Sequence, residues 1–187
     1  MKVLIVIPSR YGSTRFEGKP LIDIHGKSLV QRTYLQAMKA ALDATVIVAT
    51  DDERIFNHVK NFGECMYTSS HHISGTDRCF EVAEKYGAGF DVLINLQGDE
   101  PFILPSQIED LANAFYNKDC DIATLKKKIT GDEDLNNPNI VKVVSGANDK
   151  ALYFSRSVIP YLRSAAGEWA GQFEYYRHVG MYAFRRE

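Results

Sequence analysis

The chain has 187 residues, 45% of them hydrophobic, which is enough to bury one sizeable core, so we expect a single domain over residues 1–187. Its formal net charge of −2 lacks the excess of Lys and Arg that binding to nucleic acids or anionic membranes requires, so we expect neither partner. The three cysteines are scattered and form no C-x-x-C pair, which argues against a disulfide framework and a structural zinc site and favours a reducing compartment.

The apolar segments give no sign of export or of membrane insertion. The first apolar run, residues 3–7, turns polar at Ser9 and Arg10 and is too short for the core of a signal peptide. No run approaches the ~20 apolar residues that span a bilayer. We therefore expect a soluble, cytoplasmic protein.

Short β-branched runs alternate with amphipathic helical periods along most of the chain. Strands are predicted at residues 3–7, 45–50, 65–68 and 91–96. Helices are predicted at residues 28–41, after the capping pair Asp51-Asp52, at residues 76–86 and after the capping box Ser106-x-x-Glu109.

The rest of the chain continues with strands and loops. Further strands are predicted at residues 122–125, 141–144, 152–154 and 179–184, with a polar loop at 130–139. Pro160 prevents a long helix near the end of the chain. The alternation of strands and helices predicts a three-layer α/β fold with a mainly parallel sheet, in which ligands bind beyond the carboxyl ends of the strands.

The loop at residues 8–20 has the composition of a phosphate-binding site. Two arginines and Lys19 lie in it together with two glycines, so cations and backbone N–H groups are available to one polyanion. The loop does not fit the P-loop pattern, because five residues rather than four separate its glycines. Two interpretations stay open: a looser clamp in which Arg10, Lys19 and the backbone amides around Gly12 and Ser13 bind the anion, or a solvated surface turn.

Asp99 directly follows the strand predicted at residues 91–96, where a carboxylate is well placed to hold a divalent cation that bridges phosphate oxygens. A solvated turn formed by Asp99 and Glu100 before Pro101 fits the spacing equally well. The metal site is favoured because the first strand also ends in a loop rich in cations. A cation, a metal carboxylate and a phosphate would then meet at one edge of the sheet, a site suited to metal-assisted attack at a phosphate.

The histidines give weaker signals. His71 and His72 are adjacent in a loop, with no Cys or carboxylate at ligand spacing, so a polar loop is favoured over a metal site. His178 is as consistent with a half-buried, hydrogen-bonded histidine as with a binding role. The chain shows no Ser/His/Asp or Cys/His pattern, which argues against nucleophilic catalysis.

Eight collinear motifs, which together extend over nearly the whole chain, carry a resemblance to a known family. They are PSRYGSTR at residues 8–15, GKPL at 18–21, VATD at 48–51, SGTDR at 74–78, NLQGDEP at 95–101, NPNIVKVV at 137–144, ALYFSR at 151–156 and RHVGMY at 177–182. With these motifs the chain resembles the 3-deoxy-manno-octulosonate cytidylyltransferases, also called CMP-Kdo synthetases.

The resemblance implies that CTP and the acidic eight-carbon sugar Kdo react to give CMP-Kdo and pyrophosphate, which activates Kdo for lipopolysaccharide biosynthesis. It also implies a nucleotide-diphospho-sugar transferase-like fold, Mg²⁺ as cofactor and a homodimer. In the mechanism that we infer from it, the anomeric hydroxyl of the sugar attacks the α-phosphate in line, while magnesium, Arg10 and Lys19 stabilise the charge on the phosphates.

The resemblance also assigns roles to residues by their position in the motifs. The catalytic residues are Arg10, Lys19 and Asp99, and Asp99 is the magnesium ligand. The nucleotide is expected to contact Arg10, Ser13, Lys19, Ser74, Gly75, Arg78 and Gln97. The sugar is expected to contact Gln97, Arg156, His178 and Tyr182.

Two departures from the family pattern keep alternatives open. Glu17 stands where the family usually has Pro, which places an acidic side chain in the phosphate loop. The family pattern also continues into a C-terminal segment with an Asp-Thr motif and a second metal carboxylate, which residues 1–187 lack. The alternatives are a nucleotide-binding relic without turnover, and a cytidylyltransferase for a related acidic sugar, an amino-Kdo or a sialic acid.

Overall fold

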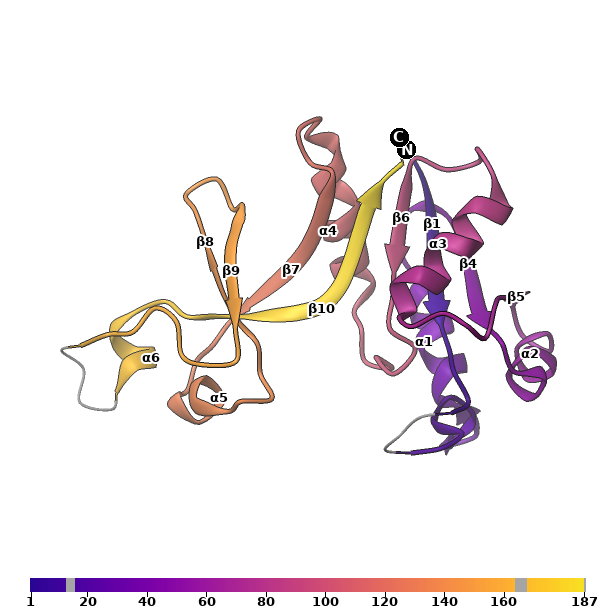
Figure 1. The fold of residues 1–187 in the computed structure, drawn as a ribbon, viewed down its shortest axis with the longest axis horizontal. Helices are drawn as coiled ribbons and strands as arrows, with labels where there is room; N and C mark the ends of the chain where they lie inside the picture. Colours follow the sequence, from indigo (N-terminus) through magenta and orange to yellow (C-terminus); the bar gives the residue numbers. More distant parts are fainter. Residues whose placement is uncertain (13–15, 164–167, 187) are drawn as a thin grey trace. The chain divides into compact units, whose positions relative to one another are not determined.

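Figure 1 shows the chain as a computed structural model, which describes residues 1–12, 16–163 and 168–186. The contacts divide the chain into two compact units, Met1–Ala123 with Met181–Glu187, and Thr124–Gly180. The expectation of a single domain stays a prediction. None of the described helices is long and apolar enough to cross a membrane.

The first unit is built on a sheet whose central strands are buried on both faces. Its parallel strands are, in order, β5 (Glu64–Tyr67), β4 (Asp43–Thr50), β1 (Lys2–Pro8) and β6 (Val92–Asn95). The last residues of β10 (Tyr176–Arg185) pair with β6 in the antiparallel direction. Residues 3–7 of β1 are at most 2% exposed, and a strand covered on both faces has no polar side, which explains its continuous apolar run.

Helices cover this sheet and give the three-layer α/β fold that the sequence predicted. α3 (Gly75–Tyr86) packs Cys79 and Val82 against one face. Because side chains alternate along a strand, Val3, Ile5 and Ile7 of β1 face the other side, and they are buried too. α1 (Leu29–Ala37) contacts both β4 and α4 (Pro105–Asn113). The other short elements are η1 (Lys19–Leu21), β2 (Asp23–Ile24), β3 (Lys27–Ser28), α2 (Glu53–Val59) and η2 (Ala114–Tyr116).

The start of α4 differs from the prediction. The predicted capping box Ser106-x-x-Glu109 is wrong, because the helix begins before Ser106. Leu104 is the N-cap, and its N–H donates a hydrogen bond of 2.9 Å to the side chain of Gln107. Pro105 takes the first helical position, because its fixed φ suits that position and it lacks the N–H that would be unpaired there. The Glu109 carboxylate instead accepts a 2.7 Å hydrogen bond from the Ala41 N–H, in the turns that follow α1. α1 accordingly ends at Ala37, before the predicted residue 41.

The second unit is mainly antiparallel. β8 (Lys142–Ser145) pairs with β9 (Ala151–Ser155) and with the first residues of β10, and β7 (Ile122–Lys128) pairs with β10. The prediction of a mainly parallel sheet therefore holds for the first unit. The loop predicted at residues 130–139 contains the short helix α5 (Asp132–Asn136), because its Leu135 is buried against Ile129 and Tyr175. The unit also contains the short helix α6 (Trp169–Gln172).

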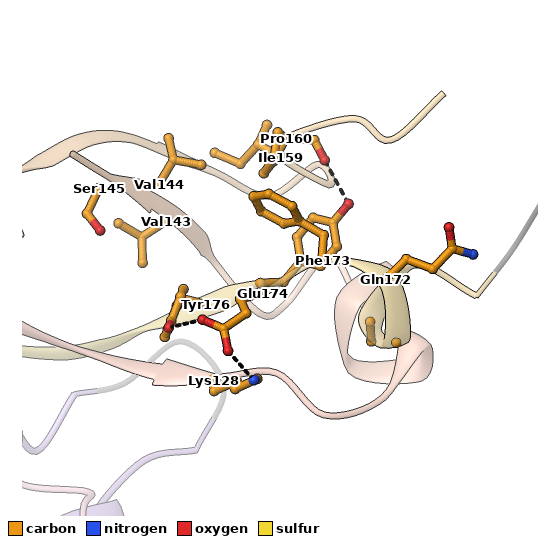
Figure 2. A pocket seen from close by; sticks show the side chains of 13 residues that line it. Lys128, Val143, Val144, Ser145, Ile159, Pro160, Gln172, Phe173, Glu174 and Tyr176 are labelled. Atoms are coloured by element: carbon orange, nitrogen blue, oxygen red, sulfur yellow. Dashed lines mark hydrogen bonds and ion pairs between the residues drawn. The ribbon is translucent and has the colours of Figure 1, made fainter. Parts of the chain in front are cut away.

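A cavity of about 590 Å³ lies within the second unit (Figure 2). Its wall includes Val143 from β8 and Phe173 after α6, and at one side Glu174 pairs with Lys128 and accepts a 3.0 Å hydrogen bond from the Tyr176 hydroxyl. None of the described residues that the sequence assigned to the site lines this cavity. The candidate site is therefore built from other surfaces.

Candidate functional site

The loops that follow β1 and β6 meet at the carboxyl edge of the parallel sheet. β1 and β6 are direct neighbours, with Val6 opposite Asn95 in register, so both strands deliver their following loops to the same edge. There the Lys19 Nζ donates to the Asp99 Oδ2 at 2.6 Å, and each side chain is 43% exposed. The sequence predicted that a cation and a carboxylate meet at this edge, and the structure brings the two together across 80 positions of the chain.

The phosphate loop is closed on itself in its described part. The Gly18 N–H donates a 2.8 Å hydrogen bond to the Tyr11 carbonyl oxygen, and Gly18 adopts a left-handed conformation with φ of 70° directly before η1. The Arg54 guanidinium of α2 lies over the Tyr11 ring at 3.2 Å from its centroid. Both interpretations of this loop, the phosphate clamp and the solvated turn, stay predictions. The predicted contact of Ser13 lies outside the described residues.

Gly18 is required at its position for two reasons, which a pair of variants separates. An added Cβ would lie 3.1 Å from the Tyr11 ring, in a backbone conformation that L-residues rarely adopt. Gly26 has a similar φ of 79° but open space around an added Cβ. We expect Gly18→Ala to lower the free energy of unfolding by about 2 kcal/mol and Gly26→Ala by about 1 kcal/mol, measured by urea unfolding. Equal losses would show that the Tyr11 contact contributes nothing.

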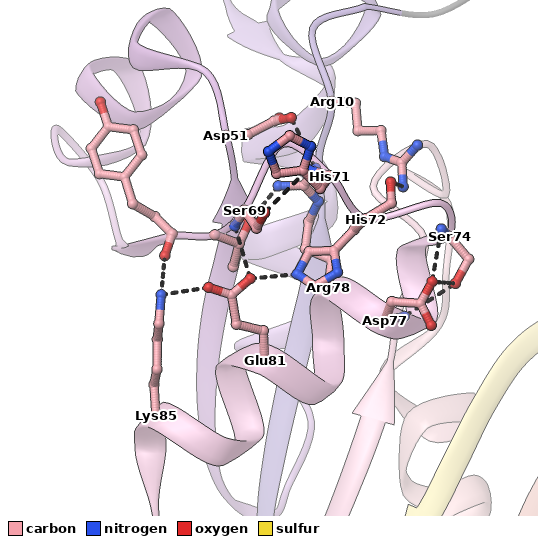
Figure 3. A network of polar contacts seen from close by, with 12 residues as sticks. Arg10, Asp51, Ser69, His71, His72, Ser74, Asp77, Arg78, Glu81 and Lys85 are labelled. Carbon is pink, nitrogen blue, oxygen red and sulfur yellow. Dashed lines mark hydrogen bonds and ion pairs between the residues drawn. The ribbon is translucent and has the colours of Figure 1, made fainter.

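Arg10, the second predicted phosphate contact, is held by the loop between β5 and α3. Its Nη2 donates a 2.7 Å hydrogen bond to the backbone carbonyl oxygen of His72, and Figure 3 shows the two groups side by side. The imidazole of His72 itself contacts Glu81 of α3. His72 therefore belongs to a polar loop, as the sequence favoured, and this loop is linked to Arg10, a predicted phosphate contact.

The N-terminus of α3 lies close to the end of β1. Ser74 is the N-cap and forms a reciprocal capping box with Asp77, whose pKa is lowered chiefly by the hydrogen bond from the Ser74 hydroxyl. A Cβ on Gly75 would lie 3.2 Å from Pro8, so only a glycine allows this close approach without a shift. The positive end of the α3 dipole thus lies near the phosphate loop, an arrangement that favours anions.

Arg78 is fully buried in this structure, which the sequence did not indicate. Its Nη1 donates to the Thr68 hydroxyl, and its Nη2 lies 3.1 Å from the Asp51 carboxylate. These contacts join α3 to the ends of β4 and β5. The nucleotide contact assigned to Arg78 stays a prediction, and the partners that the structure gives it are internal.

Two buried polar atoms at the strand ends were missed from the sequence. Ser9 Oγ and Asn95 Oδ1 have no hydrogen-bond partner among the described residues, although buried polar atoms are normally paired with protein, water or ligand. An added Cβ on Gly98 would lie 3.0 Å from Ser9 Oγ. The loop after β6 therefore approaches the end of β1 closely. Two predicted sugar contacts lie near these strand ends. Gln97 is exposed in the loop after β6, and Tyr182 of β10 lies opposite Asn95 of β6.

Two predicted sugar contacts, Arg156 and His178, lie in the second unit. The Arg156 Nη1 donates a 2.9 Å hydrogen bond to the Pro138 carbonyl oxygen. The His178 Nε2 lies 2.8 Å from the Thr124 hydroxyl, and burial lowers the pKa of the imidazole. The half-buried, hydrogen-bonded histidine that the sequence left open is confirmed, and its contact with the sugar stays a prediction.

Asp99 suits a metal that arrives with its own ligands. Among residues 1–12, 16–163 and 168–186, no three His, Cys, Asp or Glu side chains gather in a group that could hold a metal ion. Mg²⁺ is commonly held by one or two carboxylates, with phosphate oxygens and water as the other ligands. One exposed carboxylate beside an expected triphosphate site fits that pattern.

The comparisons with known proteins agree with this geometry. The family model of the cytidylyltransferases matches residues 4–187. The chain is 50% identical to a 3-deoxy-manno-octulosonate cytidylyltransferase of Parabacteroides distasonis, over 100% of this chain and 76% of the relative. It is 48% identical to a protein of the same name from Cytophaga hutchinsonii, over 99% of this chain and 75% of the relative.

Solved structures give the same result. A CMP:2-keto-3-deoxy-manno-octonic acid synthetase complexed with CTP matches 99% of this chain and 74% of its own, with 45% identity and a TM-score of 0.90. A 4-diphosphocytidyl-2C-methyl-D-erythritol synthase from Anaerococcus prevotii covers 98% of this chain and 69% of its own at 13% identity and a TM-score of 0.58, a likeness of fold alone. The chain belongs to the cytidylyltransferase family and, within it, to the 3-deoxy-manno-octulosonate cytidylyltransferases.

Proposed function

We propose that this protein joins CTP to Kdo, gives CMP-Kdo and pyrophosphate, and so supplies activated Kdo in the cytoplasm for lipopolysaccharide biosynthesis. The observation that carries the proposal is that Lys19 and Asp99 meet at the carboxyl edge of the sheet. There Lys19 would bind the triphosphate, and Asp99 would bind the metal. The similarity to a CMP:2-keto-3-deoxy-manno-octonic acid synthetase that was solved with CTP supports the choice of nucleotide and sugar.

In the proposed reaction, the chain binds and orients the two substrates. Arg10 and Lys19 bind the triphosphate from the loop after β1, with the Arg10 guanidinium held by the His72 carbonyl. The anomeric oxygen of Kdo forms a new bond to the α-phosphorus. The bond from that phosphorus to the bridging oxygen breaks on the opposite side, pyrophosphate leaves, and the hydroxyl proton passes to solvent. The two cations stabilise charge that builds up on the phosphate oxygens during this exchange.

Magnesium is the proposed cofactor, and Asp99 is the residue of this chain that would hold it. When bound, the metal neutralises charge on the phosphate oxygens. Asp99 pairs with Lys19 at 2.6 Å, so the carboxylate would exchange this cation for the metal. That exchange leaves Lys19 available to the triphosphate.

Binding an acidic sugar beside a triphosphate is the main electrostatic difficulty. Two like charges 4 Å apart repel by about 4 kcal/mol at an effective dielectric constant of ~20. Cations that bind the triphosphate and the sugar carboxylate offset that repulsion. We propose that Arg156 supplies a cation to the sugar and that Gln97, His178 and Tyr182 bind the hydroxyl and carboxylate groups of the sugar.

The proposal is tested by product formation with a panel of sugars. The purified protein, given CTP, Kdo and MgCl₂, is expected to release one pyrophosphate for each CMP-Kdo formed. A coupled phosphate assay measures the pyrophosphate, and chromatography measures the CMP-Kdo. An amino-Kdo and a sialic acid, supplied in place of Kdo, are expected to react more slowly. Calorimetry that shows CTP binding while no sugar of the panel gives product would support a nucleotide-binding relic instead.

We also propose that the protein is a homodimer and that β9 lies in its interface. β9 is the last strand in the order of its sheet, and its Leu152 and Tyr153 are 70% and 63% exposed. A sheet edge with exposed apolar side chains is a site for association. Light scattering is expected to give twice the chain mass for the wild type and the monomer mass for the double variant Leu152→Asp, Tyr153→Asp. A monomeric wild type at micromolar concentration would contradict the proposal.

A further inference from the structure

The segment between β5 and α3 carries two groups of the proposed site, although it has no regular secondary structure. The His72 carbonyl oxygen accepts the hydrogen bond from Arg10, and Ser74 caps α3. Among the described residues, the backbone of the segment pairs at its start, where the Thr68 N–H donates to the Thr50 carbonyl oxygen at 2.9 Å, and at its end, where the Ser74 carbonyl oxygen accepts from the Arg78 N–H. The position of the His72 carbonyl therefore depends on contacts made by side chains.

Glu81, on the second turn of α3, contacts the segment at Ser69 and at His72 (Figure 3). One carboxylate oxygen, Oε2, accepts a 2.8 Å hydrogen bond from the Ser69 N–H and contacts the His72 Nε2. The other, Oε1, pairs with Lys85 Nζ at 2.6 Å, and the same Nζ donates to the Tyr67 carbonyl oxygen at 2.9 Å. The Glu81 carboxylate thus connects α3 to the segment at two positions, Ser69 and His72.

The charge of Glu81 is needed for this arrangement. Its side chain is only 19% exposed, and this burial raises the pKa of the carboxyl, but hydrogen bonds from Lys85, Ser69 and His72 outweigh the effect and lower the pKa to about 2. The carboxylate is therefore ionised at any pH at which the protein would work. Both oxygens accept hydrogen bonds, which a Gln side chain cannot reproduce, because its NH₂ group would face one set of donors.

We infer that Glu81 and His72 are positioning residues for Arg10: the Glu81 carboxylate and the His72 imidazole fix the His72 carbonyl, and that carbonyl aims the Arg10 guanidinium at the expected triphosphate. This inference rests on the proposed function, because it gives Arg10 its purpose. The two residues would act on the nucleotide through the His72 carbonyl and Arg10, without a contact of their own to the substrate. The substitution Glu81→Gln keeps the size of the side chain, and His72→Ala removes the imidazole while it leaves the carbonyl in the chain.

A double-mutant cycle with Arg10→Ala separates positioning from general stability. We expect Glu81→Gln and His72→Ala each to weaken CTP binding about tenfold in the wild-type background, the loss of one charge-assisted hydrogen bond, and to have no further effect in the Arg10→Ala background. Glu84→Gln, on an exposed face of the same helix, is the matched control and is expected to bind CTP as the wild type does. Thermal unfolding of each variant reports its stability separately.

The Arg10 side chain gives a readout that does not need a substrate. Its Nε–Hε signal in ¹H–¹⁵N NMR spectra, assigned by its loss in Arg10→Ala, is expected to move toward the position of a free arginine in Glu81→Gln and in His72→Ala. An unmoved signal, or an equal loss of CTP binding in the wild-type and Arg10→Ala backgrounds, would overturn the inference. A wild type that binds CTP but forms no CMP-Kdo would count against the proposed reaction instead. The NMR test of the Arg10 position would still hold, because it needs no turnover.

Discussion

Lys19→Ala is expected to lower kcat/KM for CTP by about 10²- to 10³-fold, because it removes a cation that would face the developing charge on the phosphates. The free energy of unfolding should change by less than about 1 kcal/mol, since the pair with Asp99 is half exposed and such pairs contribute little to stability. Steady-state kinetics at saturating Kdo measure the first quantity, and urea unfolding measures the second.

Lys27→Ala is the matched control, because Lys27 is an exposed cation in β3 on the same stretch of chain. It is expected to leave kcat/KM within about twofold of the wild type, which corresponds to a small surface effect. A loss in Lys19→Ala no larger than in Lys27→Ala would remove the phosphate loop from the proposed site. The variant Lys19→Arg keeps the charge but not its compact shape, and is expected to fall between the two.

Arg78→Met is expected to lower the free energy of unfolding by about 3 kcal/mol, because it removes the fully buried partner of an ion pair and leaves Asp51, which is 23% exposed, uncompensated. The measurement is urea unfolding monitored by circular dichroism. Asp51→Asn in the Arg78→Met background should recover part of the loss, since it removes the charge that has no partner.

The same variant tests the nucleotide contact that the family resemblance assigns to Arg78. With Arg78 fully buried on Thr68 and Asp51, we expect the folded variant to bind CTP with an affinity reduced by less than about tenfold, the effect of an indirect change. Unchanged stability together with a loss of CTP binding would show that Arg78 contacts the nucleotide directly. Calorimetry at a temperature where the variant is folded distinguishes these two outcomes.

Features that depend on local pattern agree well between sequence and structure. β1 and β4 lie where continuous β-branched runs predicted buried strands, and α3 spans Gly75–Tyr86, close to the predicted residues 76–86. The meeting of Lys19 and Asp99 was also predictable, since neighbouring parallel strands deliver their loops to one edge. Periodicity and turn chemistry suffice for features of this kind.

Features that depend on tertiary contacts were not visible in the sequence. α5 forms because Leu135 is buried against Tyr175, which is distant in the chain, and its composition had suggested a loop. Nothing in the spacing of Glu81 and His72 shows that a helix side chain holds the segment before it. The burial of Arg78 likewise depends on Asp51, which the sequence had given only a capping role.

The most direct measurement follows the phosphorus atoms of CTP by ³¹P NMR after Kdo and MgCl₂ are added to the purified protein. A cytidylyltransferase for Kdo predicts that the three CTP signals decrease together while one phosphodiester signal appears together with a pyrophosphate signal of twice its intensity, since pyrophosphate carries two phosphorus atoms. CTP signals that persist in the presence of Kdo, or that give way to CDP and inorganic phosphate, would contradict it.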